Sequence, residues 1–508
     1  MNRICRKGLA LLVPLFLGGQ LAHAQEQHAP RVQETKSRAA GAPRLTASHL
    51  LLFGSIPVST RSVEARKAAE LAINKYEAVL LGDAMVHATH ATELDHNFAL
   101  GYAVLSFASR RGVPNEAAMN RAKALLPLAT PDEQLMVRWM TSLQDRNLLP
   151  AIASMNDLLR RYPKDKHVLY LTSEWLYLQE DFERSQKMME SLRDLDPNYP
   201  PVLNMLGYSY IESGHPDAAK AVAALKHYAE VEPSSPNPED SLGEVLRYAG
   251  DDEGSLQHYG AALQVDPTFF TSQLGLGDTL TLMGKFDDAR FEYDKALLVS
   301  ENDRDLLHAL YQKALIYFWE GKAEQGRAAL AELATQAAEK KEPNAQAEIG
   351  LGAAMLAADY SSELQQLHAL EEKLQNAVEG MNGADRGGAL ANVLSEEARV
   401  AAQHGDHAEA DQAISKLAQF AAKSGDLVVG NHYETARGFQ LLSQGDLSGA
   451  VEQLSANRRS PLAVQQMATA QQEAGDKKAA EESLYELKYQ RAPTVEWYLA
   501  SLSGSVKR

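Results

Sequence analysis

Closely spaced histidine and aspartate residues are the first features of this sequence that could support chemistry. They form two groups: His87, His90, Asp95 and His96, and further along the chain His404, Asp406 and His407. Imidazoles three residues apart on one helix face can share a zinc ion. Two histidines on an exposed helix face nevertheless usually bind nothing, so we expect no metal site and no cofactor.

Two glycine-containing segments resemble catalytic loops only in outline. Residues 277–286 have the wrong spacing for a phosphate-binding loop, and Phe286 stands where magnesium binding needs Ser or Thr. Residues 207–211 lack the second glycine of a nucleophile elbow. The sequence contains neither an H-E-x-x-H motif nor EF-hand spacing. We therefore expect no catalytic residues and predict that the chain is not an enzyme.

The chain is acidic and otherwise ordinary in composition. Its 508 residues include 50 Lys and Arg against 67 Asp and Glu, which gives a formal net charge of −17 at pH 7. Nucleic acids attract proteins that carry basic patches. The charge therefore argues against a nucleic-acid partner.

The first 24 residues have the three marks of a secretory signal peptide. A basic start is followed by an apolar run over residues 9–17 and then by Ala22-His23-Ala24. The run is too short to span a membrane, so we expect cleavage after Ala24 and no transmembrane segment in the mature chain. The single cysteine, Cys5, would be removed, which leaves no disulfide. We expect an exported protein, periplasmic or secreted.

Residues 25–60 are rich in Gln, Ala, Ser, Thr and Pro and have little periodicity, which is typical of a flexible linker. We expect the apolar cluster at residues 50–53 to pack on the first helices rather than to bind a partner. No stretch of the sequence alternates with a period of two for long enough to predict a strand.

A repeat of 34 residues organises the part of the chain that follows the linker. Two windows match at one offset, the first with Leu242, Gly243, Leu246, Gly250, Tyr259 and Ala262, the second with Leu276, Gly277, Leu280, Gly284, Tyr293 and Ala296. Apolar residues also recur at the i, i+3, i+4 spacing of helices. The repeat predicts a pair of antiparallel helices per unit.

Small residues and prolines recur at fixed positions of each predicted helix pair. We expect small side chains where two helix backbones approach closely, and prolines where the second helix stops. These repeat-structural positions are Gly207, Gly243, Gly277, Ala289, Ala296, Pro197 and Pro267. The fold class predicted is all-α.

The pattern L-G-x-x-Y…A…P at 34 residues resembles the tetratricopeptide repeat. The resemblance implies a helical-hairpin solenoid coiled into a right-handed superhelix. We divide the chain into a signal peptide (1–24), a linker (25–60), an array (61–340, with its best repeats in 132–300), a helical connector with a Gly-rich break at 379–388 (341–388), and degenerate repeats with a capping helix (389–508).

Proteins with this repeat bind peptide segments on the concave face, which is lined by the first helix of each hairpin. The template places ten residues there: Tyr170, Glu174, Tyr177, Asn204, Tyr208, Ile211, Glu244, Tyr248, Asp278 and Phe318. This lining is aromatic and acidic, and it suits a protein or peptide with apolar side chains and some positive charge. It lacks the Lys and Arg residues that clamp a C-terminal carboxylate in chaperone-type members.

The resemblance implies a non-catalytic exported scaffold or adaptor for a protein or peptide, of the kind found in cell-envelope assembly or export. The alternative is a module that binds a small molecule, glycan or metal in a pocket of the superhelix, with or without catalysis. Self-association through the C-terminal half is compatible with the first function.

Overall fold

A computed structural model describes residues 49–109, 115–145, 148–212 and 214–502. Within these residues the chain forms 25 α-helices, two 3-10 helices and one two-stranded hairpin. The predicted all-α solenoid of helical hairpins is confirmed. The predicted signal peptide and the first part of the linker, residues 25–48, lie outside the described residues.

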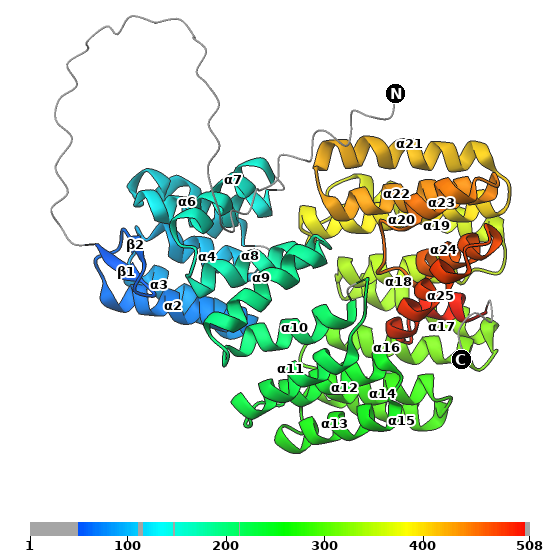
Figure 1. Cartoon of the computed structure of the whole chain (residues 1–508), viewed down its shortest axis with the longest axis horizontal. Helices are drawn as coiled ribbons and strands as arrows, with labels where there is room; N and C mark the ends of the chain where they lie inside the picture. The colour runs from blue at the N-terminus through cyan, green and yellow to red at the C-terminus, as the bar shows by residue number, and fades with distance from the viewer. Residues whose placement is uncertain (1–48, 110–114, 146–147, 213, 503–508) are drawn as a thin grey trace, which may run out of the picture.

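Successive helices pair as antiparallel hairpins through most of the described residues (Figure 1). The first part consists of α2 (Val63–Glu77), α3 (Leu81–Leu94), α4 (Ala99–Ser109), α5 (Glu116–Leu125), η1 (Leu126–Leu128), α6 (Pro131–Gln144), α7 (Leu148–Arg161), α8 (Lys166–Leu178) and α9 (Phe182–Leu195). The middle consists of α10 (Pro200–Glu212), α11 (Ala218–Val231), α12 (Asn237–Ala249), α13 (Asp252–Val265), α14 (Phe270–Leu282), α15 (Phe286–Val299), α16 (Asp303–Trp319) and α17 (Ala323–Glu339).

The last part continues the same pairing. It consists of α18 (Pro343–Met355), α19 (Tyr360–Gln375), α20 (Gly383–Gln403), α21 (His407–Ser424), α22 (Leu427–Ser443), α23 (Leu447–Leu454), α24 (Pro461–Glu473), α25 (Lys477–Leu487), η2 (Lys488–Gln490) and α26 (Val495–Leu502). The predicted Gly-rich break at 379–388 is shorter in the structure, because α20 already begins at Gly383.

The turn inside several hairpins consists of a glycine followed by an aspartate. Gly250 and Gly445 both have a φ of +81°, which a residue without a Cβ adopts at no steric cost. The next residue caps the following helix, as Asp251 and Asp446 each accept a hydrogen bond from a backbone N–H of the first turn. Each two-residue step therefore ends one helix and starts the next.

Residues 49–60 are folded, which corrects the prediction of a flexible linker there and of a chain without strands. Strands β1 (Leu50–Leu52) and β2 (Ile56–Val58) pair antiparallel. The side chains of Leu52, Ile56 and Val58 are fully buried in the core that continues through the first helices. The apolar cluster at residues 50–53 packs on the first helices, as we expected. Each strand is only three residues long, too short for alternation to be visible in the sequence.

A buried carboxylate holds this hairpin against the helices. Glu133 of α6 is fully buried and accepts hydrogen bonds from the backbone N–H of Ser59, at 2.6 Å, and of Leu100, at 3.1 Å. Burial raises the pKa of this carboxyl above its usual value. One side chain thus joins the hairpin to α4 and α6.

The solenoid curves until its C-terminal part contacts its first half (Figure 1). Arg459 pairs with Glu212 of α10 at 2.7 Å, and Arg491 pairs with Asp252 of α13 at 2.6 Å. The amide of Asn431 on α22 donates to a carboxylate oxygen of Glu180 at 2.6 Å. The curved array is therefore closed by contacts between residues far apart in the sequence.

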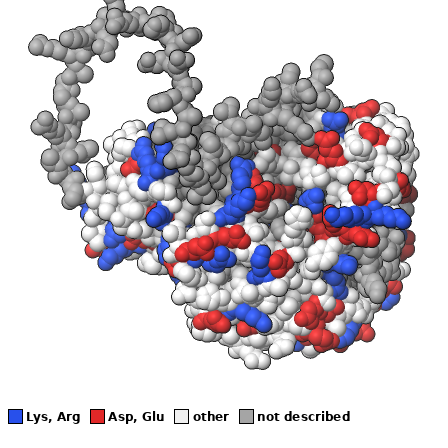
Figure 2. All heavy atoms as spheres, in the orientation of Figure 1, with Lys and Arg blue, Asp and Glu red and all other residues white. Residues whose placement is uncertain are grey.

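Charges of both signs are interspersed over the face of the molecule that Figure 2 presents. Among the helices of the described residues, none combines the length and apolar character needed to cross a membrane.

Candidate functional site

Five of the ten residues predicted for the groove line a single cavity. They are Tyr170, Glu174, Tyr177, Asn204 and Tyr208. The cavity has a volume of about 260 Å³ and lies between α8, α10 and the end of α2. We call α8, α10, α12 and α14 the inner helices, since each packs beside the next across successive hairpins. The template therefore selected residues that do meet in space.

Tyrosine–glutamate pairs connect the inner helices. Tyr177 of α8 donates its hydroxyl to Glu212 of α10, and Tyr208 of α10 donates to Glu244 of α12 at 2.9 Å. Tyr248 donates to the second oxygen of Glu244, also at 2.9 Å. Burial, reinforced by Glu244, raises the pKa of Tyr208 and Tyr248 well above the usual value, so both hydroxyls remain donors.

Asp278 and Glu244 belong to an internal ion-pair network. The guanidinium of Arg247 lies 2.6 Å from Asp278 and 3.1 Å from Glu244, and the hydroxyl of Tyr293 donates to Asp278 at 2.8 Å. Asp278 is buried and lines neither this cavity nor the larger one described below. Arg247 and Tyr293 therefore hold the carboxylate of Asp278 inside the array.

Phe318 is also a packing residue rather than a groove residue. Its side chain is buried, and its ring lies against Gly326 of the next helix so closely that no Cβ fits there. The 34-residue template identified the correct helix, α16, but not how deeply this position is buried.

A second cavity of about 800 Å³ lies where the closed solenoid surrounds a central space. Two further predicted groove residues, Ile211 of α10 and Tyr248 of α12, line one wall of it. The other walls come from α16, α18, α20 and the C-terminal segment, including Tyr311, Arg458 and Glu496. The C-terminal helices therefore face the inner helices across this cavity, which the sequence analysis did not anticipate.

The C-terminal segment also covers part of the predicted groove directly. The guanidinium of Arg459 lies 5.3 Å from the ring centroid of Tyr177 and 5.4 Å from that of Phe182, besides its ion pair with Glu212. The end of the groove near α9 is consequently occupied by the chain itself, while the end near α2 is open to a ligand as the 260 Å³ cavity.

The repeat-structural residues have the geometry of close-packed hairpins. A Cβ at Gly243 would lie 2.8 Å from the ring of Tyr259, and one at Gly277 would lie 2.5 Å from the ring of Tyr293. Both pairs are related by the 34-residue offset. A Cβ at Gly207 would lie 2.5 Å from Leu225 on α11, the second helix of the same hairpin.

The other repeat-structural positions occupy equivalent places. Ala289 and Ala296 are fully buried on α15, and Pro197 and Pro267 follow the ends of α9 and α13. Paired helices with this period and these contacts decide the architecture. The fold is a tetratricopeptide-type solenoid.

Comparisons with known proteins gave matches among solved structures alone. No family model matches the sequence, and no curated protein matches it. Among solved structures, a tetratricopeptide repeat protein from Parabacteroides merdae ATCC 43184 is 15% identical, with a TM-score of 0.38, covering 52% of this chain and 98% of that one.

Two further solved structures are of the same type. The thermophilic TPR protein TTC0263 from Thermus thermophilus is 18% identical, with a TM-score of 0.31, covering 41% of this chain and 99% of its own. YrrB, described as a TPR protein with an unusual peptide-binding site, is 14% identical, with a TM-score of 0.26, covering 35% of this chain and 90% of its own.

The histidine groups noted in the sequence lie at ordinary positions of the solenoid. His90 is 3.7 Å from Glu93 on the exposed face of α3. His404 stacks on Tyr360 and bonds through Nδ1 to the carbonyl of Val400 at 2.9 Å, and Asp406 caps α21. Neither group brings three ligand atoms together among the described residues.

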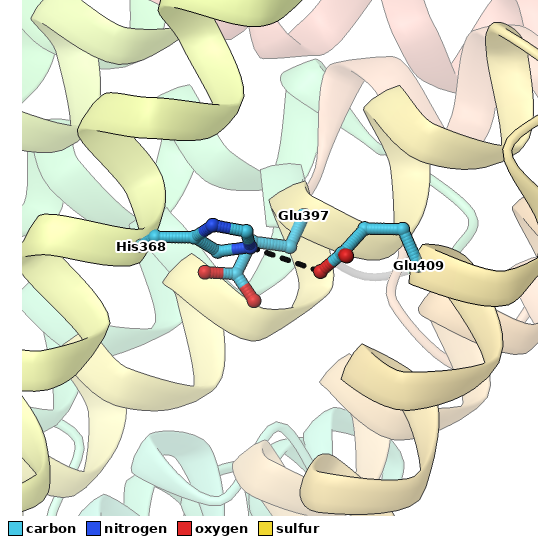
Figure 3. Close-up of side chains that lie close together, drawn as sticks. All are labelled: His368, Glu397 and Glu409. Carbon is cyan, nitrogen blue, oxygen red and sulfur yellow. Dashed lines mark hydrogen bonds and ion pairs between the residues drawn. The ribbon is translucent and has the colours of Figure 1, made fainter.

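A different cluster does bring potential metal ligands together. His368 of α19, Glu397 of α20 and Glu409 of α21 offer one ligand atom each, and these atoms lie within 4.8 Å of one another (Figure 3). Nε2 of His368 is 2.9 Å from Oε1 of Glu409. Burial, reinforced by the neighbouring Glu371, raises the pKa of Glu397 to about 8.

Sequence analysis missed this cluster for a simple reason. Its three residues are 29 and 12 positions apart and come from three helices, so no local motif joins them. The only signal in the sequence is that each lies in a segment with helical periodicity.

Proposed function

We propose that this chain is a non-catalytic repeat scaffold that binds a segment of a partner protein against α8, α10 and the end of α2. The observation that carries the proposal is the 260 Å³ cavity, in which five template-selected residues converge. The tetratricopeptide-type solenoid supports it in general terms, because such arrays present a concave surface built from first helices.

The chemistry of the cavity determines the kind of segment that fits. Tyr76, Tyr177 and Tyr208 provide ring surface that can cover apolar side chains. Glu174, which accepts hydrogen bonds from the hydroxyl of Tyr76 at 3.0 Å, provides a carboxylate at the wall. A partner segment with apolar side chains and a Lys or Arg matches this lining. We expect binding to weaken as salt is raised, since the net charge of −17 favours the encounter.

The test is a photo-crosslink from the cavity in cells. Met205 lines the cavity from α10, so a photoreactive amino acid at this position should trap the bound segment. The matched control is Leu298 of α15, whose side chain is 85% exposed on the outside of the array. We expect one dominant protein adduct from position 205 and none of that mass from position 298.

Two results would count against the scaffold. No adduct from position 205, in a chain that is folded and correctly located, would leave the cavity without a protein ligand. The same adducts from positions 205 and 298 would indicate contact without a defined site.

A second candidate function rests on the larger cavity. A volume of about 800 Å³ lies within the range of small-molecule sites, and its lining mixes Tyr311, Arg458 and Glu496 with apolar side chains. A small molecule or glycan bound there would be detected by native mass spectrometry as a fixed mass increment. Met355→Trp, which adds bulk at the cavity wall, should remove that increment and leave the crosslink from position 205 unchanged.

We also propose that the protein is exported. The support is the basic start, the short apolar run and Ala22-His23-Ala24 in residues 1–24. N-terminal sequencing of the protein from its native cells should begin at Gln25, and a chain that still begins at Met1 would contradict export by this route.

A further inference from the structure

Three consecutive helices bring a histidine and two glutamates to one place. His368 on α19 points toward Glu409 on α21, and the side chain of Glu397 on α20 reaches the same place beside the ring of His368 (Figure 3). The donor set is one imidazole nitrogen and two carboxylate oxygens. Such a set, from three separate elements, is typical of sites for divalent transition metals.

The carboxylate of Glu397 has no partner within the described protein. The residue has 0% exposure, and neither Oε1 nor Oε2 accepts or donates a hydrogen bond. A buried ionised carboxylate without a partner is strongly unfavourable, and a protonated one would still leave its O–H unsatisfied. A bound cation would supply the missing partner, so this side chain points independently to a ligand.

The ionisable groups around Glu397 are mostly carboxyl groups. Glu371 and Glu409 are the neighbouring carboxylates, and Lys416 is the neighbouring ammonium group. Lys416 is already paired with Glu371 at 2.7 Å. Three carboxyl groups therefore lie around a single lysine, and that lysine already has a partner.

We propose that His368, Glu397 and Glu409 bind one divalent transition-metal ion of the zinc type. Zinc takes nitrogen and carboxylate ligands at about 2.0–2.2 Å and accepts three protein ligands with a further position for water. Calcium would require six to eight oxygens, which this cluster does not offer. The ring of His368 is 43% exposed, so an ion can enter from solvent and the ring can rotate to bring its nitrogen closer.

The ion would tie together α19, α20 and α21, which pack against one another in sequence order. It therefore fastens α21 (Figure 1) to the two helices before it. This position is away from the cavity between α8 and α10, so the metal site and the proposed partner site can be tested separately.

The experiment uses the full chain purified without a polyhistidine tag, treated with a chelator and dialysed. Zinc chloride is the probe, followed by calorimetric titration and by thermal unfolding. We expect one zinc ion per chain and a rise in Tm of a few degrees at saturating zinc, because an ion that binds only the folded state stabilises it. Glu397→Gln should reduce zinc affinity at least tenfold and remove the Tm shift.

Two further variants keep the result interpretable. His368→Ala removes a ligand from a half-exposed position, so it should abolish binding without impairing folding. Glu239→Gln is the matched control: it removes the carboxylate of another His–Glu pair, with His258 at 2.6 Å, that has no third ligand among the described residues. We expect this variant to bind zinc like the unaltered chain.

Either of two outcomes would overturn the proposal. The first is the absence of stoichiometric binding by the unaltered chain. The second is binding and a Tm shift that persist in both Glu397→Gln and His368→Ala, which would assign the zinc to surface histidines instead.

Discussion

At the scale of single residues, glycines and tyrosines specify how the hairpins pack. Gly243 and Gly277 contact the rings of Tyr259 and Tyr293, and no side chain larger than hydrogen fits between them. The sequence predicted that both glycines stand at a close approach, because they recur at 34 residues, but it did not predict that the neighbour would be a tyrosine ring. It did not predict that Asp278 is buried, since its partner Arg247 lies on a different helix and is not part of the repeat template.

Gly277→Ala tests the close approach. The added Cβ would lie 2.5 Å from the ring of Tyr293, which is fully buried and hydrogen-bonded to Asp278, so the ring cannot easily move. We expect a loss of about 1–3 kcal/mol in the free energy of unfolding, measured by urea denaturation. The control is Gly260→Ala in α13, where nothing lies within 4 Å; there we expect a gain of about 0.5–1 kcal/mol. Equal effects at both positions would contradict the packing argument.

At the scale of elements, buried polar contacts link inner helices that the apolar pattern only places side by side. Asp240 of α12 accepts a hydrogen bond from the hydroxyl of Ser272 on α14 at 2.6 Å. The helices themselves were predictable from periodicity and from the glycines at several of the turns. The hairpin of β1 and β2 was not, because three residues per strand are too few to show alternation.

The contact between Asp240 and Ser272 predicts a pH dependence of stability. Burial raises the pKa of Asp240 to about 7, whereas the unfolded chain has a value near 3.8. Between these values the folded state retains a proton that the unfolded state releases, so stability falls as the pH rises from about 4 to about 7. Asp240→Asn stays neutral, so the free energy of unfolding should fall by about 1–4 kcal/mol less over this pH range than in the unaltered chain. The measurement is urea denaturation at a series of pH values.

The matched control for Asp240→Asn is Asp287→Asn, at a fully exposed side chain on α15. This variant should keep the slope of the unaltered chain. Burial also raises the pKa of Glu363 and Glu486 to about 7, so some decline with pH should remain after Asp240 is replaced. An unchanged slope in Asp240→Asn would mean that this carboxyl titrates in the folded state as it does in the unfolded chain.

At the scale of the whole molecule, the solenoid is closed by ion pairs that the sequence does not reveal. Arg459 and Glu212 are 247 residues apart, and Arg491 and Asp252 are 239 apart. A repeat period describes contacts between neighbouring units, so it predicts an open superhelix and is silent on contacts between its ends. The turn at Glu180 takes part in this closure, because the side chain of Glu180 accepts a hydrogen bond from Asn431. Glu180 has a φ of +61°, where equivalent turns have glycine.

Removing the two arginines tests whether these pairs keep the solenoid closed. The double variant Arg459→Ala, Arg491→Ala leaves each helix intact but deprives Glu212 and Asp252 of their partners. We expect unchanged helix content by circular dichroism, a larger radius of gyration by small-angle X-ray scattering, and faster amide exchange in α22–α26. The control Arg160→Ala, Lys187→Ala removes the same charge from pairs within single helices and should change none of these.

A double variant as compact as the unaltered chain would show that apolar contacts, such as the packing of Tyr489 against the inner helices, suffice for closure. In that case the central cavity would be a permanent feature of the fold and would not depend on ionic strength, whereas closure by ion pairs makes its access sensitive to salt.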